Sequence, residues 1–326
     1  MEESQIRARV EEVTERSPRG RIRVFTDTSD FMSITAGDVI RIGDVHYYVY
    51  GEEREGRFGL DEQPKLWVKR AVDLETGRKK VLKLGFYESF VMRVGDVPVK
   101  CFRSPRKEAR ILEKTRDDPH FMCGVGREDA AGNLVRILDR INGLSIYDYI
   151  QRLDTDHESY FHEEFPRIFT SVLTSVRAIE RLHAAGELHG DIRNDHLWRD
   201  RDSDDWRWID FDYTYEWTEN PFGNDLYGLG NILLFTAGQG FHTMKSLETC
   251  LPTDVPGTTC LEPADFSLFF GHRVMNLRKL FPYMPESLNR VLMRFAHRVE
   301  VLYRDVSEMV SELEACRRDL CGNGEA

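Results

Sequence analysis

Two short stretches decide the fold of this chain: HGDIRNDH at residues 189–196 and IDFD at residues 209–212. Each contains an aspartate, and Asp191 and Asp210 lie 19 positions apart. The residues between them read as a hairpin of short strands, and the spacing suits one. Such a hairpin would return both aspartates to one site.

The rest of the chain divides into two parts by its periodicity. From about residue 21 to residue 83, short runs of β-branched and aromatic residues are separated by turns, which predicts strands. Apolar residues over 165–182 follow the i, i+3, i+4, i+7 rule and predict a long amphipathic helix, and helical patterns dominate again after Asp225. We therefore expect an α+β protein with a small β-rich lobe, a larger α-helical lobe and a boundary near 139–143.

Composition narrows the class of protein. The 326 residues are 41% hydrophobic and 31% charged, typical of a globular chain, and the net charge of −11 argues against nucleic acid as a partner. The longest apolar run, at 232–235, is too short to span a bilayer, and the six cysteines form no CxxC pair. We expect a cytoplasmic protein with reduced thiols and no membrane partner.

The two aspartates suit phosphoryl transfer. That reaction needs a metal held by carboxylates, a cation on the phosphates and a base near the acceptor hydroxyl. Asp191, Asp210 and the neighbouring Arg193 supply these groups within one short segment.

The segment from Leu182 to Trp198 resembles the catalytic loop of the protein kinase superfamily, and Asp210-Phe211-Asp212 resembles its DFG element. Three further segments share this resemblance: 67–83 with two strands of the small lobe, 225–233 with the buried helix that anchors the catalytic loop, and 285–313 with the last helices of bacterial Ser/Thr kinases. The resemblance implies a bilobal kinase-like fold, with an N-terminal β-rich extension at 1–45, an N-lobe at 46–140 and a C-lobe at 141–326.

The resemblance also implies cofactors and roles. ATP and Mg²⁺ would bind, with Asp191 as catalytic base and Asp210 as metal ligand. Lys83 would contact the α- and β-phosphates while paired with Glu108, and Arg193 would steady the γ-phosphate. The positions that would meet adenine are Val81 on the roof of its pocket, Asp139 at the hinge and Trp198 on the floor.

Several departures from the family pattern are chemically informative. His196 stands where the family has the asparagine that holds a second metal, and an imidazole favours Mn²⁺ or Zn²⁺ over Mg²⁺. Three outcomes stay open: His196 tunes the choice of metal, the site holds one metal with Asp195 or Asp212 helping, or the chain is an inactive relative. No closely spaced glycines precede Val68, and Gly51, Gly56 and Gly59 lie too far upstream unless the hairpin is unusually long. Only 14 residues separate Asp210 from Asp225, too few for a peptide-docking activation segment.

These departures leave three functions open. The first is an ATP-dependent phosphotransferase of the Ser/Thr protein kinase type, acting on an unknown protein. The second is a kinase of a small hydroxyl compound, of the choline or aminoglycoside type, which the short segment after Asp210 favours. The third is a non-catalytic pseudokinase scaffold, which His196, Trp198 and the missing glycines favour. The connection at 84–107 reads as an insertion.

Overall fold

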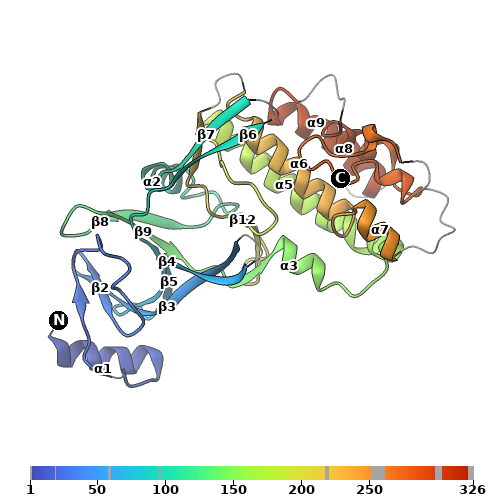
Figure 1. Cartoon of the computed structure of the whole chain (residues 1–326). Coiled ribbons are helices and arrows are strands. Elements are labelled where there is room, and N and C mark those ends of the chain that lie inside the picture. The colour runs from blue at the N-terminus through green and yellow to red at the C-terminus, as the bar shows by residue number, and fades with distance from the viewer. Residues whose placement is uncertain are drawn as a thin grey trace. The chain divides into compact units, whose positions relative to one another are not determined.

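The structure is a computed structural model that describes residues 2–18, 20–57, 60–94, 97–216, 220–250, 261–297 and 303–321. The chain forms two compact units (Figure 1). Unit 1 comprises Met1–Ser89, Phe102–Asp117 and Phe121–Ile141, and unit 2 comprises Phe90–Cys101, Asp118–His120 and Asn142–Ala326. The class is α+β, as the sequence predicts.

Unit 1 is built on a seven-stranded sheet in the order β1-β2-β3-β4-β5-β9-β8. All neighbours are antiparallel except β1 and β2. The strands are β1 (Val24–Phe25), β2 (Val39–Ile42), β3 (Val45–Arg57), β4 (Leu60–Asp73), β5 (Lys79–Lys83), β8 (Gly124–Glu128) and β9 (Leu134–Asp139). Alternate side chains such as Val49, Ala71, Leu82 and Val135 are fully buried and form the core of the sheet.

The N-terminal extension, which we expected to be β-rich, begins with a helix, α1 (Glu3–Thr14). Ile6 and Val10 lie four residues apart on one face and pack into a small apolar cluster with Leu74 of the β4–β5 turn. Glu2 and Gln5 form a reciprocal capping box at its start. The expectation was wrong here because the apolar face is narrow and most of the helix is polar.

The β3–β4 hairpin is longer than we expected. Its pairing runs from Tyr47–Asp73 at one end to Arg57–Leu60 at the other, with three register shifts on the way. Gly51 and Gly56 therefore lie within β3 itself rather than upstream of the hairpin, and Gly59 lies outside the described residues.

Unit 2 is mainly helical. Among its described residues are α3 (Ile146–Gln151), α4 (His157–Ser159), a π-helical turn (Tyr160–Glu164), α5 (Phe165–Ala184), α6 (Gly223–Ala237), α7 (Met244–Cys250), α8 (Glu286–Met293), α9 (Val306–Cys321) and the 3₁₀ turns Pro263–Asp265 and Leu277–Lys279. The predicted amphipathic helix is α5, and its apolar stripe is buried. It contacts both α6 and α9 (Figure 1), so its regular face supplies the centre of the unit 2 core.

Two small sheets complete unit 2. One joins β10 (Gly143–Ser145), β11 (Leu197–Asp200) and β12 (Trp206–Trp208), and the other runs in the order β13-β7-β6 with β13 (Tyr213–Glu216), β7 (Val97–Arg103) and β6 (Ser89–Val94). Strands β6 and β7 come from the connection that the sequence marked as an insertion. β7 pairs with β13, which follows Asp210, and β6 pairs with β7, so this connection builds unit 2 instead of forming a separate loop.

Candidate functional site

The two aspartate-bearing stretches meet in unit 2. The β11–β12 hairpin pairs Leu197 with Trp208, and the Ile209 amide donates to the His196 carbonyl at 3.0 Å. The hairpin thus closes as the sequence predicted. It brings Asp210 close enough to Asp191 for the two carboxylates to interact electrostatically.

A buried carboxylate anchors the loop that carries Asp191. Asp225, 1% exposed near the start of α6, accepts the backbone amides of His189 at 2.6 Å and Gly190 at 2.7 Å, and His183 Nε2 lies 2.9 Å away. Burial alone would raise the pKa of Asp225. The hydrogen bond and charge of His183, helped by His189 and the Gly190 amide, outweigh it and lower that pKa. The ionised carboxylate therefore fixes the loop backbone.

Glycine is required at two positions that pack this loop. Gly190 has φ 86°, and an added Cβ would lie 2.0 Å from the Tyr213 carbonyl oxygen on β13. At Gly228 on α6, a Cβ would lie 2.5 Å from Cβ of Ile192. The backbone before Asp191 thus touches β13, and the residue after it rests on α6.

Asp191 lies in a setting that favours its protonated form. Its side chain is only 20% exposed, and burial raises its pKa. Interactions with His196 and Arg193 oppose that rise, while Asp210 and Asp212 add to it. A raised pKa makes the Asp191 carboxylate a stronger proton acceptor than an ordinary aspartate.

His196 and Arg193 form a compact polar group beside the two aspartates. His196 is buried, with Nδ1 2.7 Å from the Asp191 carbonyl oxygen and Nε2 2.8 Å from Arg193 Nη2. The same Nη2 donates to Asp195 at 2.8 Å. His196 Nε2 also lies 3.6 Å from Asp210 Oδ2. Asp210 and the three predicted residues of the first stretch, Asp191, Arg193 and His196, are therefore brought together.

Asp210 has an unusual backbone. Its φ of 61° lies in the left-handed region, which non-glycine residues adopt rarely and aspartate more readily than most. Such conformations cost about 1–3 kcal/mol and cluster at functional sites. Its side chain is 17% exposed.

In unit 1, Lys83 and Glu108 form the expected ion pair. Lys83 Nζ lies 2.5 Å from Glu108 Oε1, and both side chains are at most 5% exposed. Ser104 caps α2 (Pro105–Lys114) by accepting the Lys107 amide, which places Glu108 in the first turn on the buried face.

The sequence reasoning missed Arg136. This arginine, fully buried on β9, places Nε 3.0 Å from Glu108 Oε2 and donates through Nη1 to the Leu84 carbonyl. Glu108 is thus held between two cations. The sequence does contain a sign of this role, because Arg136 lies inside the otherwise apolar run 134–138. A charged side chain in a buried strand needs an oppositely charged or hydrogen-bonding partner.

The three residues expected to meet adenine lie on separate elements. Val81 on β5 pairs with Leu138 of β9. At the end of β9, the Asp139 amide donates to the Cys123 carbonyl at 2.9 Å, so this N–H is already used within unit 1. Trp198 on β11 donates its indole N–H to the Asp195 carbonyl at 2.8 Å.

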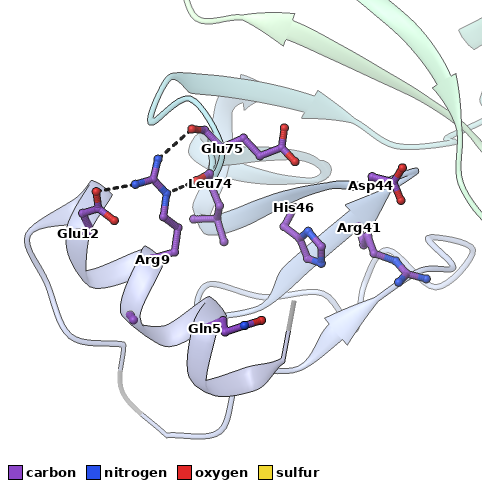
Figure 2. Close-up of a pocket in the computed structure, with 9 residues that line it drawn as sticks. Gln5, Arg9, Glu12, Arg41, Asp44, His46, Leu74 and Glu75 are labelled. Atoms are coloured by element: carbon purple, nitrogen blue, oxygen red, sulfur yellow. Dashed lines mark hydrogen bonds and ion pairs between the residues drawn. The ribbon is translucent and has the colours of Figure 1, made fainter.

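A separate depression of about 860 Å³ lies in unit 1, between α1, the β2–β3 turn and the β4–β5 turn (Figure 2). Arg9 is its most prominent cation. Its guanidinium bonds to the carbonyls of Leu74 and Glu75 and pairs with Glu12. Because the chain itself satisfies this cation, the depression is a weaker candidate for a ligand site.

Comparison of the sequence with models of known protein families and with curated proteins found no match. Within the described residues, no helix is long and apolar enough to cross a membrane. The same residues contain no group of three or more histidine, cysteine, aspartate or glutamate side chains arranged as a metal cage. Mg²⁺ in phosphotransfer sites usually rests on one or two carboxylates plus substrate phosphates, so Asp210 and its neighbours still suit it.

Proposed function

We propose that this chain is an ATP-dependent phosphotransferase with a bilobal, protein-kinase-like fold. The observation that carries the proposal is the Asp225 anchor. A buried ionised carboxylate on α6 holds the backbone amides of residues 189 and 190, immediately before Asp191. Burying a charge for this purpose costs free energy, which argues for a loop whose exact position matters.

Asp191 is the proposed base. As the acceptor hydroxyl attacks the γ-phosphorus, its proton passes to the Asp191 carboxylate, the new O–P bond forms and the bond to the departing ADP breaks. The elevated pKa of Asp191 strengthens it as a proton acceptor. Asp210 would hold Mg²⁺, which neutralises charge on the phosphates when bound.

Lys83 is the proposed phosphate-binding cation. Glu108 fixes its ammonium, and Arg136 in turn fixes the second oxygen of Glu108. A lysine held this way is already ordered, so little side-chain entropy is lost when it meets a phosphate.

The test is release of ADP and transfer of labelled γ-phosphate from ATP with Mg²⁺ or Mn²⁺. Asp191→Asn should lower turnover about 10²–10⁴-fold, the usual contribution of a general base, and Asp210→Asn should lower it at least as much. The matched control is Asp202→Asn, which removes an exposed carboxylate from the same hairpin and should leave turnover unchanged. No nucleotide-dependent thermal shift and no turnover with either metal would leave the pseudokinase scaffold as the better account.

A specific observation favours a small hydroxyl compound as acceptor over a protein. The segment after Asp210 is short and forms strand β13, which pairs with β7. A paired strand cannot also serve as a long docking loop for a peptide. Screening acceptors with labelled ATP separates the two, since label found on protein alone would exclude the small-molecule kinase.

A further inference from the structure

The most unusual contact beside the two aspartates is between Arg193 and His196. Nη2 of the guanidinium lies 2.8 Å from both His196 Nε2 and Asp195 Oδ2, and Arg193 Nε lies 3.9 Å from Asp191 Oδ1. An arginine side chain is thus fixed among an imidazole and two carboxylates.

The hydrogen bonds decide which tautomer of His196 is present. Nδ1 lies 2.7 Å from the Asp191 carbonyl oxygen, which can only accept, so Nδ1 carries the proton. Arginine has donors and no acceptor, so Nε2 must accept from it. The ring is therefore neutral, and its single lone pair is on Nε2.

That lone pair points to a place where a metal could bind. Nε2 lies 3.6 Å from Asp210 Oδ2 and 3.9 Å from Asp195 Oδ2. One imidazole nitrogen and two carboxylate oxygens suit Mn²⁺ or Zn²⁺, whose bonds to such atoms are about 2.0–2.2 Å long. Because these donor atoms lie close together, a small shift would let them share one ion.

We propose that Arg193 is a built-in cation that occupies this place and restricts the site to one divalent metal. This rests on the proposed function, in which Asp210 holds the metal that accompanies ATP. The guanidinium cannot lose its proton near neutral pH, so it stays paired with Asp195 and blocks Nε2 permanently. Replacing Arg193 by alanine should turn the same three groups into a metal site.

The experiment counts bound Mn²⁺ by electron paramagnetic resonance on the full chain. Without nucleotide, Arg193→Ala should bind Mn²⁺ at least about tenfold more tightly than wild type, the scale on which neighbours of metal ligands change affinity. Its spectrum should show coupling to an imidazole nitrogen, which Arg193→Ala/His196→Ala should lack. The control is Arg201→Ala, which removes the same charge from an exposed side chain of the next turn and should behave as wild type.

With a non-hydrolysable ATP analogue, wild type should bind one Mn²⁺ and Arg193→Ala two. Two ions bound to wild type, or no gain and no nitrogen coupling in Arg193→Ala, would overturn the inference. Failure of wild type to bind any Mn²⁺ with nucleotide would instead count against the proposed function. The nucleotide-free comparison of wild type and Arg193→Ala still decides the inference in that case.

Discussion

At the scale of single residues, the buried carboxyl group of Asp191 lowers the free energy of unfolding at neutral pH. Burial raises the pKa of Asp191 in the folded chain, so folding favours the protonated carboxyl group. The stability of the protein therefore falls as the pH rises from the ordinary pKa of 3.8 through the pKa in the folded chain. Asp191→Asn should therefore stabilise the protein at neutral pH by about 1 kcal/mol, the usual gain when one destabilising residue is replaced. Urea unfolding measures this.

The pH dependence provides the control for Asp191. The gain from Asp191→Asn should shrink as the pH falls toward 3.8, because wild-type Asp191 is then protonated in both states. Asp202→Asn, on an exposed side chain, should show neither the gain nor its pH dependence. A destabilised Asp191→Asn protein at neutral pH would contradict the assignment of burial as the main influence.

Glu108 makes the second prediction at this scale. Its carboxylate is fully buried between Lys83 and Arg136. Glu108→Gln leaves two buried cations without a counter-charge, which should cost about 3–5 kcal/mol in the free energy of unfolding. Glu113→Gln, an exposed change on the same helix, should stay within about 0.5 kcal/mol. Similar losses of stability in Glu108→Gln and Glu113→Gln would contradict a buried charge cluster of Lys83, Glu108 and Arg136.

At the scale of elements, the contact between β13 and the loop before Asp191 can be isolated with two glycines. Gly190 and Gly186 both have positive φ, 86° and 75°, but only Gly190 approaches other backbone. Gly186→Ala should cost about 1–2 kcal/mol, the price of a left-handed residue. Gly190→Ala should cost more, by about 1–3 kcal/mol of added overpacking, and should lower any phosphotransfer. Thermal unfolding of both variants tests this, and equal losses would show that β13 does not press on the loop.

At the scale of the whole molecule, the two units interleave along the chain. Residues 90–101 belong to unit 2 although the neighbouring segments belong to unit 1. A fragment of residues 142–326 therefore lacks β7, the partner of β13. A synthetic peptide of residues 88–104 should raise the melting temperature of this fragment by about 2–4 °C for each kcal/mol of binding. A scrambled peptide should have no effect, and an equal shift with both peptides would argue against strand pairing.

The sequence by itself determined the features that depend on local patterns. The 3.6-residue period predicted α5, because a helix must bury one continuous stripe. The aspartates of HGD and DFD, separated by a short hairpin, predicted that Asp191 and Asp210 would lie at one site. The Lys83–Glu108 pair, which only the family resemblance implied, is present in the structure.

Only the tertiary structure decided the features that depend on contacts between distant segments. Arg136 joins Glu108 from another strand, and β7 pairs with β13 across more than a hundred residues. The tertiary structure also decides which group contacts the imidazole of His196. Sequence shows an arginine three residues before a histidine, but whether that imidazole faces a metal or a guanidinium depends on which side chain folding brings to its lone pair. Long-range packing, not local propensity, sets that choice.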